Sequence, residues 1–168
     1  MKKTGIWFAI AIVVIVIDQV TKVWAESVLI DGNVIVVTSF FKFQLAYNTG
    51  AAFSFLGDAG GWQRWLFAVI AFVVSIGIAI WIKKLATSAK TDRYWELLAL
   101  SLILGGAIGN LYDRVLLGHV IDFIVWHYEQ HYWPTFNIAD SAICAGAALL
   151  VFDMLFIQDH KTEDEKTN

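Results

Sequence analysis

The chain has 168 residues, of which 58% are hydrophobic and 16% are charged, and its mean hydropathy is +0.64. This composition excludes an ordinary soluble domain, which could not bury so many uninterrupted apolar runs. The net charge of −3 and the lack of a basic stripe argue against a nucleic-acid partner. We therefore expect one integral membrane domain over residues 1–168, surrounded by membrane lipids.

Four membrane-spanning helices are predicted, because a bilayer crossing needs about 20 mainly apolar residues. The first apolar run follows Lys2 and Lys3, lacks an Ala-x-Ala cleavage pattern and continues past Asp18, so we interpret it as an uncleaved span. Small residues four apart, at Gly105 and Gly109, predict close helix packing. The predicted spans cover residues 6–24, 65–82, 96–113 and 137–157.

Two segments between the spans differ in character. Residues 31–61 open with the turn signal DGN and continue with apolar and polar residues in alternation over 41–48, which predicts strands of a small amphipathic sheet. Residues 114–135 are polar and aromatic, and we expect a loop there. The predicted fold is therefore a membrane α-helical protein with four transmembrane helices, a small β-sheet and a loop, both on the outer membrane face.

The distribution of Lys and Arg predicts the orientation of the chain in the membrane. Both termini are expected to be cytoplasmic, which places residues 31–61 and 114–135 on the outer face. The residues assigned to the cytoplasmic side are Lys2, Lys3, Lys83, Lys84, Lys90, Arg93, Lys161 and Lys166, against Lys22, Lys42, Arg64 and Arg114 on the outer side.

Two aspartates at the edges of apolar segments are candidates for chemistry. Asp122 lies in GHVIDFI and Asp140 in TFNIADS, with Pro134 between them, so they cannot be neighbours on one continuous helix. An unpaired carboxylate is costly in such surroundings and often marks a functional site. If the two meet, one can hold a proton while the other is ionised, so that one activates water and the other polarises a carbonyl.

Structural alternatives exist for these acidic residues. Asn137 could cap the fourth span, with Asp140 in its first turn, where the helix dipole favours a negative charge. Asp122 could pair with Arg114 or His119.

Two further acidic residues have expected structural roles. We expect Asp113, together with Arg114, to support a helix end, with Arg114 anchoring a loop or bonding carbonyls. Asp18 and Lys22, four apart on one helix face, could simply pair.

Other functions remain open from the residues alone. His127 and His131, four apart with Glu129 between them, could bind a metal if they lie on a helix, although the Glu follows one position later than in HExxH. A small transporter or proton relay could use Asp18, Asp122, Asp140 and Asp153. A structural membrane protein would explain the small-residue faces but not the paired aspartate segments.

Five short motifs, in this order and in a four-span chain of this size, resemble the lipoprotein signal peptidase family, also called signal peptidase II. They span nearly the whole chain. The motifs are DQVTK (18–22), NTGAAF (48–53), GNLYDR (109–114), VIDF (120–123) and FNIAD (136–140).

The resemblance implies an aspartyl endopeptidase without metal or cofactor, in the bacterial inner membrane, with its active site toward the outer face. Its substrate would be a diacylglyceryl-modified prolipoprotein, cleaved before the lipidated Cys. Asp122 and Asp140 would be the catalytic dyad. The family positions that would bind substrate or support the site are Asn48, Gly50, Asn110, Arg114, Asn137, Asp18 and Lys22.

The resemblance also assigns the two outer segments. The strand segment would be a cradle on the membrane that holds the substrate, and the aromatic residues from Trp126 to Trp133 would form a mobile cover over the dyad. We expect the protein to act as a monomer.

Overall fold

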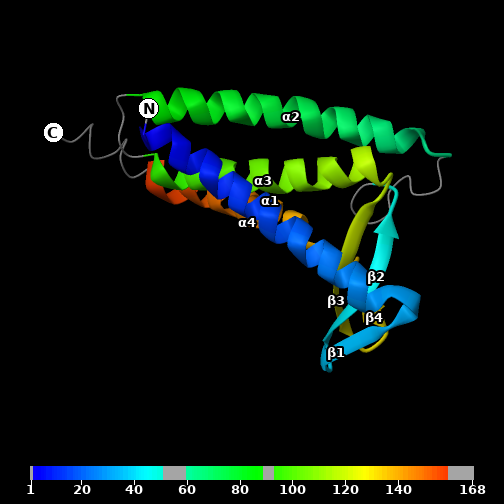
Figure 1. Ribbon diagram of the computed structural model, residues 1–168. Coiled ribbons are helices and arrows are strands. Elements are labelled where there is room, and N and C mark those ends of the chain that lie inside the picture. Colours follow the sequence, from blue (N-terminus) through cyan, green and yellow to red (C-terminus); the bar gives the residue numbers. More distant parts are fainter. Residues whose placement is uncertain (1, 51–59, 89–92, 159–168) are drawn as a thin grey trace.

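A computed structural model of the protein describes residues 2–50, 60–88 and 93–158. A short 3₁₀ turn follows the first helix, and a π-helical segment, Asp153–Gln158, follows the last. The helices form a bundle and the strands form a sheet at one end of it (Figure 1). The elements in chain order are α1 (Lys2–Leu29), β1 (Val34–Thr38), β2 (Phe41–Asn48), α2 (Trp62–Thr87), α3 (Tyr94–Leu116), β3 (Val120–Tyr128), β4 (His131–Tyr132) and α4 (Ile138–Phe152).

Within the described residues, four helical segments are long and apolar enough to cross a membrane: Thr4–Gly32, Trp62–Thr87, Tyr94–Leu116 and Ile138–Phe156. Large apolar side chains on their outer faces remain exposed, as for Val23 at 65%. Such a surface suits lipid rather than water. The predicted membrane α-helical fold with four spans and a small sheet is confirmed.

Helix α3 is the centre of the bundle and packs against α1, α2 and α4. Glycine makes this close packing possible. A Cβ on Gly105 would lie 2.7 Å from the carbonyl oxygen of Ala11, and one on Gly146 would lie 2.7 Å from that of Ala99. The small residues predicted to allow close packing therefore do so, and they bring polar side chains of three helices within hydrogen-bonding reach.

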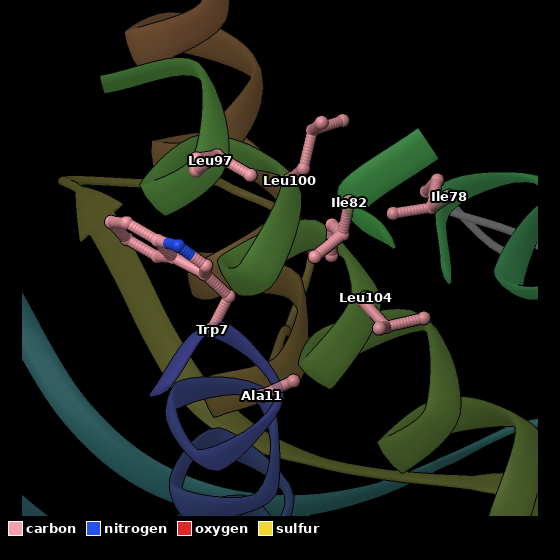
Figure 2. Packing of buried hydrophobic residues seen from close by; sticks show 7 residues of the cluster. All are labelled: Trp7, Ala11, Ile78, Ile82, Leu97, Leu100 and Leu104. Carbon is pink, nitrogen blue, oxygen red and sulfur yellow. The ribbon is translucent and has the colours of Figure 1, made fainter. Parts of the chain in front are cut away.

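An apolar cluster holds the bundle together at the end away from the sheet (Figure 2). The ring of Trp7 packs edge-on against that of Tyr94, with centroids 5.2 Å apart. Dispersion contacts among interlocked side chains supply the stabilisation, since lipid is as apolar as the bundle interior. The cluster consists of Trp7 and Ala11 of α1, Ile78 and Ile82 of α2, and Leu97, Leu100 and Leu104 of α3.

The sheet is antiparallel with the strand order β1-β2-β3-β4. It packs against the last turns of α1 through a second cluster formed by Ala25, Leu29 and Phe123. In the register of β2 and β3, Ala46 lies opposite Asp122, and the register shifts between Phe43 and Ala46. This pairing fixes Asp122 at the end of the sheet nearest the helices.

The segment expected to be a loop, residues 114–135, differs from that expectation. Helix α3 continues to Leu116, and β3 and β4 then form a hairpin that extends the sheet. Most of Val120–Val125 is buried, so its sequence lacks the alternation of apolar and polar residues from which a half-exposed strand is predicted. Part of the other outer segment, residues 51–59, including three residues of the NTGAAF motif, lies outside the described residues.

Candidate active site

Asp140 lies in the first turn of α4, where Asn137 is the N-cap. The Asn137 side-chain oxygen accepts from the backbone N–H of Asp140 at 2.9 Å, and Asp140 Oδ2 accepts from the backbone N–H of Asn137 at 3.3 Å. This reciprocal pair is a capping box, so the capping role considered for Asn137 is observed. Asp140 Oδ1 points away from the cap and accepts from Asn110 Nδ2 at 2.7 Å.

Asp122 lies in the middle of the buried part of β3 and is only 2% exposed. Its Oδ1 accepts from Asn137 Nδ2 at 2.7 Å and its Oδ2 from Asn48 Nδ2 at 3.1 Å. Neither Arg114 nor His119 donates to Asp122 among the hydrogen bonds seen in the described residues.

Asn137 joins the two aspartates, since it caps the helix of Asp140 and donates to Asp122. Two carboxylates that are eighteen positions apart in the sequence thus belong to one hydrogen-bond network. The network extends through Asn110, whose Oδ1 lies 3.2 Å from Asn137 Nδ2. The asparagines supply N–H donors, and Asp122 is left within electrostatic reach of Asp140.

Burial, and after it the charge of Asp140, raises the pKa of Asp122 from 3.8 to about 7. The hydrogen bonds from Asn48 and Asn137 act in the opposite direction, because a donor favours the ionised carboxylate. Asp122 therefore holds a proton at the pH where an ordinary aspartate is ionised. A proton donor beside a second carboxylate is the arrangement that general acid–base hydrolysis needs.

A buried charge cluster supports the site from α1 and α3. Lys22 is 1% exposed and its Nζ lies 2.8 Å from Asp18 Oδ2 and 2.7 Å from Asp113 Oδ2. The expected Asp18–Lys22 pair is therefore present and has a third member. Asp18 Oδ1 also accepts from the backbone N–H of Ala139 at 2.9 Å, which ties α1 to the start of α4. Removing Lys22 would leave two buried carboxylates without their counter-charge.

Arg114 fixes the chain that follows β2. Its Nη2 donates to the carbonyl of Gly50 at 3.0 Å and its Nη1 to the carbonyl of Asn110 at 3.2 Å. The expected role of Arg114 in anchoring a loop and bonding carbonyls is thus seen. Gly50 N–H in turn donates to Asn48 Oδ1 at 3.0 Å, so the Asn48 amide nitrogen faces Asp122.

A cleft of about 390 Å³ opens onto Asp122. Its walls come from the ends of β2 and from the chain between β4 and α4. The lining residues are Ala46, Tyr47, Asn48, Asp122, Tyr132, Trp133, Pro134 and Thr135. The cleft therefore gives access to Asp122 from the side of the sheet.

Comparison with known proteins was decisive for the family. The family described as signal peptidase (SPase) II matches residues 10–156. The chain belongs to this family. The expectation from its five motifs is thereby confirmed, and signal peptidase II is a membrane aspartic peptidase.

Relatives and solved structures agree with this membership. The lipoprotein signal peptidase of Teredinibacter turnerae is 56% identical over 150 residues, covering 89% of this chain and 87% of the relative. That of Cellvibrio japonicus is 52% identical over 160 residues, covering 95% and 91%. A solved bacterial membrane enzyme superposes with a TM-score of 0.79 at 31% identity, covering 94% of this chain and 92% of that one.

The two histidines considered as metal ligands lie on the β3–β4 hairpin of this signal peptidase II and not on a helix. His127 faces Tyr132 across the hairpin, with ring centroids 5.2 Å apart, and His131 pairs with Tyr128. The helical spacing on which the metal hypothesis depended is therefore absent. Among residues 2–50, 60–88 and 93–158, no three His, Cys, Asp or Glu side chains gather so that they could hold a metal.

Two polar residues at the signal peptidase II site were missed from the sequence. Gln19 donates to Asp113 Oδ1 at 2.9 Å and to Asp18 Oδ2 at 3.1 Å. Its position inside the DQVTK motif was a sequence signal that could have identified it. Arg64 donates to the carbonyls of Arg114 and Val115 at 2.6 and 2.7 Å, and so caps the end of α3. That contact joins residues about fifty positions apart and has no local sequence signal.

Proposed function

We propose that this signal peptidase II removes the signal peptide from diacylglyceryl-modified prolipoproteins by hydrolysing the bond before the lipidated Cys, with Asp122 and Asp140 as its catalytic pair. The observation that carries the assignment is the link through Asn137, whose side chain donates to Asp122 Oδ1 and accepts from the backbone N–H of Asp140, while its own backbone N–H donates to Asp140 Oδ2. Asp122 also lines the cleft beside the sheet, which supports its access to an extended substrate.

The positions of the two carboxylates suggest different roles. Asp140 lies in the first turn of α4, where the helix dipole favours its negative charge, and it takes the proton from the attacking water. Asp122, whose pKa is raised to about 7, gives its proton to the scissile carbonyl oxygen as water adds to the carbon.

Collapse of the tetrahedral intermediate completes the reaction. The proton on Asp140 moves to the leaving nitrogen as the carbon–nitrogen bond breaks, and a hydroxyl of the intermediate returns a proton to Asp122. The products are a signal peptide with a free carboxyl end and a lipoprotein with the lipidated Cys at its amino end. Both carboxyl groups recover their starting states.

The decisive test uses purified protein in detergent with a lipid-modified precursor peptide and a chelator. We expect cleavage that resists the chelator and is abolished by either Asp122→Asn or Asp140→Asn. Loss of cleavage on adding the chelator would favour a metal mechanism, and undiminished cleavage by either variant would exclude that residue from the pair. An unlipidated peptide of the same sequence serves as the control substrate.

The remaining site residues are proposed as support and not as reacting groups. Asn48, Asn110 and Asn137 orient the pair through their amide groups, and Gly50 and Arg114 hold the chain beside it. Asp18 and Lys22 sustain the charge cluster beneath it.

The orientation in the membrane is also a proposal. The first residues of α1 and the end of α4 lie at one end of the bundle, opposite the sheet (Figure 1). Lys83 and Lys84 end α2 there too. We therefore place both termini in the cytoplasm of a bacterial inner membrane and the carboxyl pair toward the outer face. Labelling of single cysteines introduced at position 36 or 84, in a Cys144→Ser background, with a membrane-impermeant reagent on intact cells tests this placement.

A proton relay across the bilayer is not favoured. Asp18 and Asp113 bind Lys22 near the carboxyl pair, whereas Asp153 follows α4 at the far end of the bundle. Asp153 is separated from the other carboxylates by nearly the whole of α4. A relay would need titratable groups between these positions.

A further inference from the structure

The orientation of three asparagine side-chain amides decides whether an amide nitrogen or an amide oxygen faces each aspartate carboxylate. Each of these amides has its oxygen on a group that can only donate, so its nitrogen must face the other way. For Asn48 and Asn137 that donor is a backbone N–H, of Gly50 and Asp140 respectively. For Asn110 it is the ammonium group of Lys22, whose Nζ lies 3.0 Å from Asn110 Oδ1.

The consequence for Asp140 is direct. Because the Asn110 oxygen is held by Lys22, the Asn110 nitrogen points at Asp140 Oδ1, 2.7 Å away. A reversed amide would place two acceptors, an amide oxygen and a carboxylate oxygen, against each other. A hydrogen bond to an ionised carboxylate is worth about 1.5–3 kcal/mol, so the orientation matters.

The other contact to the Asn110 oxygen is a weaker restraint. Asn137 Nδ2 lies 3.2 Å from Asn110 Oδ1, but this nitrogen also faces the carbonyl of Ile121 at 3.2 Å and Asp122 Oδ1 at 2.7 Å. Two hydrogens cannot satisfy three acceptors equally, and the shortest contact goes to the aspartate. Lys22, with three hydrogens for three acceptors, has no such conflict.

We propose that Lys22 is a positioning residue for the cleavage reaction, acting through Asn110: its ammonium group fixes the Asn110 amide so that the amide donates to Asp140 and holds it for the attack of water. This inference rests on the proposed function and assigns Lys22 a role beyond balancing buried charge. Lys22 itself touches neither member of the catalytic pair through any hydrogen bond seen among the described residues.

The test must separate this role from charge balance. Lys22→Met is combined with Asp113→Asn, so that the formal charge of Asp18, residue 22 and residue 113 remains one negative while the donor to Asn110 is lost. The reference protein is the wild type, which carries the same formal charge, and Asp113→Asn alone is assayed to measure the effect of that second substitution. Thermal unfolding and size-exclusion profiles of all three proteins establish that they fold.

Steady-state cleavage of a lipid-modified precursor peptide gives the main result. Relative to the wild type, we expect the Lys22→Met/Asp113→Asn protein to show a kcat lowered by about 10- to 100-fold, and by more than in Asp113→Asn alone, while KM changes less than about threefold. Adding Asn110→Ala to the Lys22→Met/Asp113→Asn and Asp113→Asn proteins should then erase the difference between them, because residue 22 acts through that amide. If the losses of kcat caused by the substitutions at residues 22 and 110 multiply, the proposal is overturned. An unchanged kcat after substitution of Lys22 would also overturn it.

Two further measurements keep the result unambiguous. If the Lys22→Met/Asp113→Asn protein fails to fold, Lys22→Arg alone, which keeps the charge but places its donors on a planar group, is compared with the wild type with the same expected pattern. Wild-type protein is assayed in parallel. If wild type does not cleave the peptide, the proposed function is wrong, whereas normal cleavage with a kcat insensitive to residue 22 contradicts only the role of Lys22.

Discussion

Gly109 of α3 lies directly against Asp18 of α1, so closely that a Cβ on Gly109 would be 2.6 Å from Asp18 Oδ2. We expect Gly109→Ala to push Asp18 away from both Lys22 and the N–H of Ala139, and so to lower stability and activity together. The loss of stability should be about 2–4 kcal/mol, as for other disrupted buried pairs.

The matched control for that substitution is Gly77→Ala. Gly77 lies in α2 and a Cβ there would meet nothing within 4 Å. The unfolding temperature of the Gly77→Ala protein in detergent should be equal to that of the wild type or higher, since Ala has a higher helix propensity than Gly. Equal effects of the two substitutions would contradict a specific contact between Gly109 and Asp18.

The rate of cleavage should fall as the pH rises through about 7, because the pKa of Asp122 is about 7 and the ionised form cannot donate a proton. Asn48→Ala removes a donor that favours the ionised form, so it should move this fall to higher pH. The measurement is kcat/KM from pH 5 to 9. A shift to lower pH would contradict the role of Asp122 as the acid.

Stability should also depend on pH through Asp122. The folded protein retains this proton up to a pKa of about 7, whereas the unfolded chain releases it near 3.8. The contribution is complete below the lower value and is lost as the pH rises through the upper one, amounting to at most about 4 kcal/mol at about 1.4 kcal/mol per unit. Unfolding temperatures should therefore decline between pH 5 and 8.

Asp122→Asn is the variant that checks this pH dependence. It should show a smaller decline in unfolding temperature over the same range, since Asn does not titrate. The control is Asp31→Asn, at an exposed position in the turn after α1, which should retain the wild-type slope. A slope unchanged by Asp122→Asn would show that other groups cause the decline.

Trp133 lines the cleft beside Asp122, and Trp133→Ala should weaken substrate binding. We expect KM for the lipid-modified peptide to rise about 3- to 30-fold with a smaller change in kcat, as for loss of an aromatic contact. Tyr128→Ala, at a residue that is 74% exposed and does not line this cleft, should leave KM nearly unchanged.

The hypothesis of a mobile cover needs a finer test than deleting part of residues 124–133. Such a deletion would remove the pairing of Phe41 with Trp126 and so part of the sheet itself. The substitution at Trp133 leaves this pairing intact, and unchanged kinetics there would argue against a cover formed by this segment.

Asp113→Asn should lower the yield of folded protein more than the turnover of what is folded. Asp113 binds Lys22 and Gln19 and accepts from the N–H of Ile121, but it has no contact with Asp140 among those seen in the described residues. The check is active-site titration of purified protein, which separates yield from turnover. A large fall in kcat with a normal yield would mean that Asp113 belongs to the reacting pair.

Much of the architecture could be predicted from the sequence, because bilayer crossings and small-residue packing faces depend on local composition. The strand β3 could not, since Val120–Val125 is mostly buried and its apolar run resembles a helix edge as much as a strand. The four-residue spacing of His127 and His131 was misleading for the same reason, because a hairpin places them differently from a helix.

The candidate site was only partly predictable. The five motifs named the residues that the structure brings together around Asp122 and Asp140. They did not show that one side chain, Asn137, both caps a helix and bonds the opposite aspartate, because that depends on how α4 meets β3. The cap that Arg64 places on α3 likewise arises only from tertiary packing.

Asn137 caps α4 and Asp140 lies in its first turn, whereas Asp122 precedes both of them on β3. During synthesis Asp122 therefore follows the first three helices and can meet Asn48 of β2 before Asn137 and Asp140 are made. With Asp122 and Asp140 as the proposed catalytic pair, the peptidase becomes competent only when the last helix has entered the bilayer and docked on α3. A chain that stops before α4 is therefore expected to be inactive.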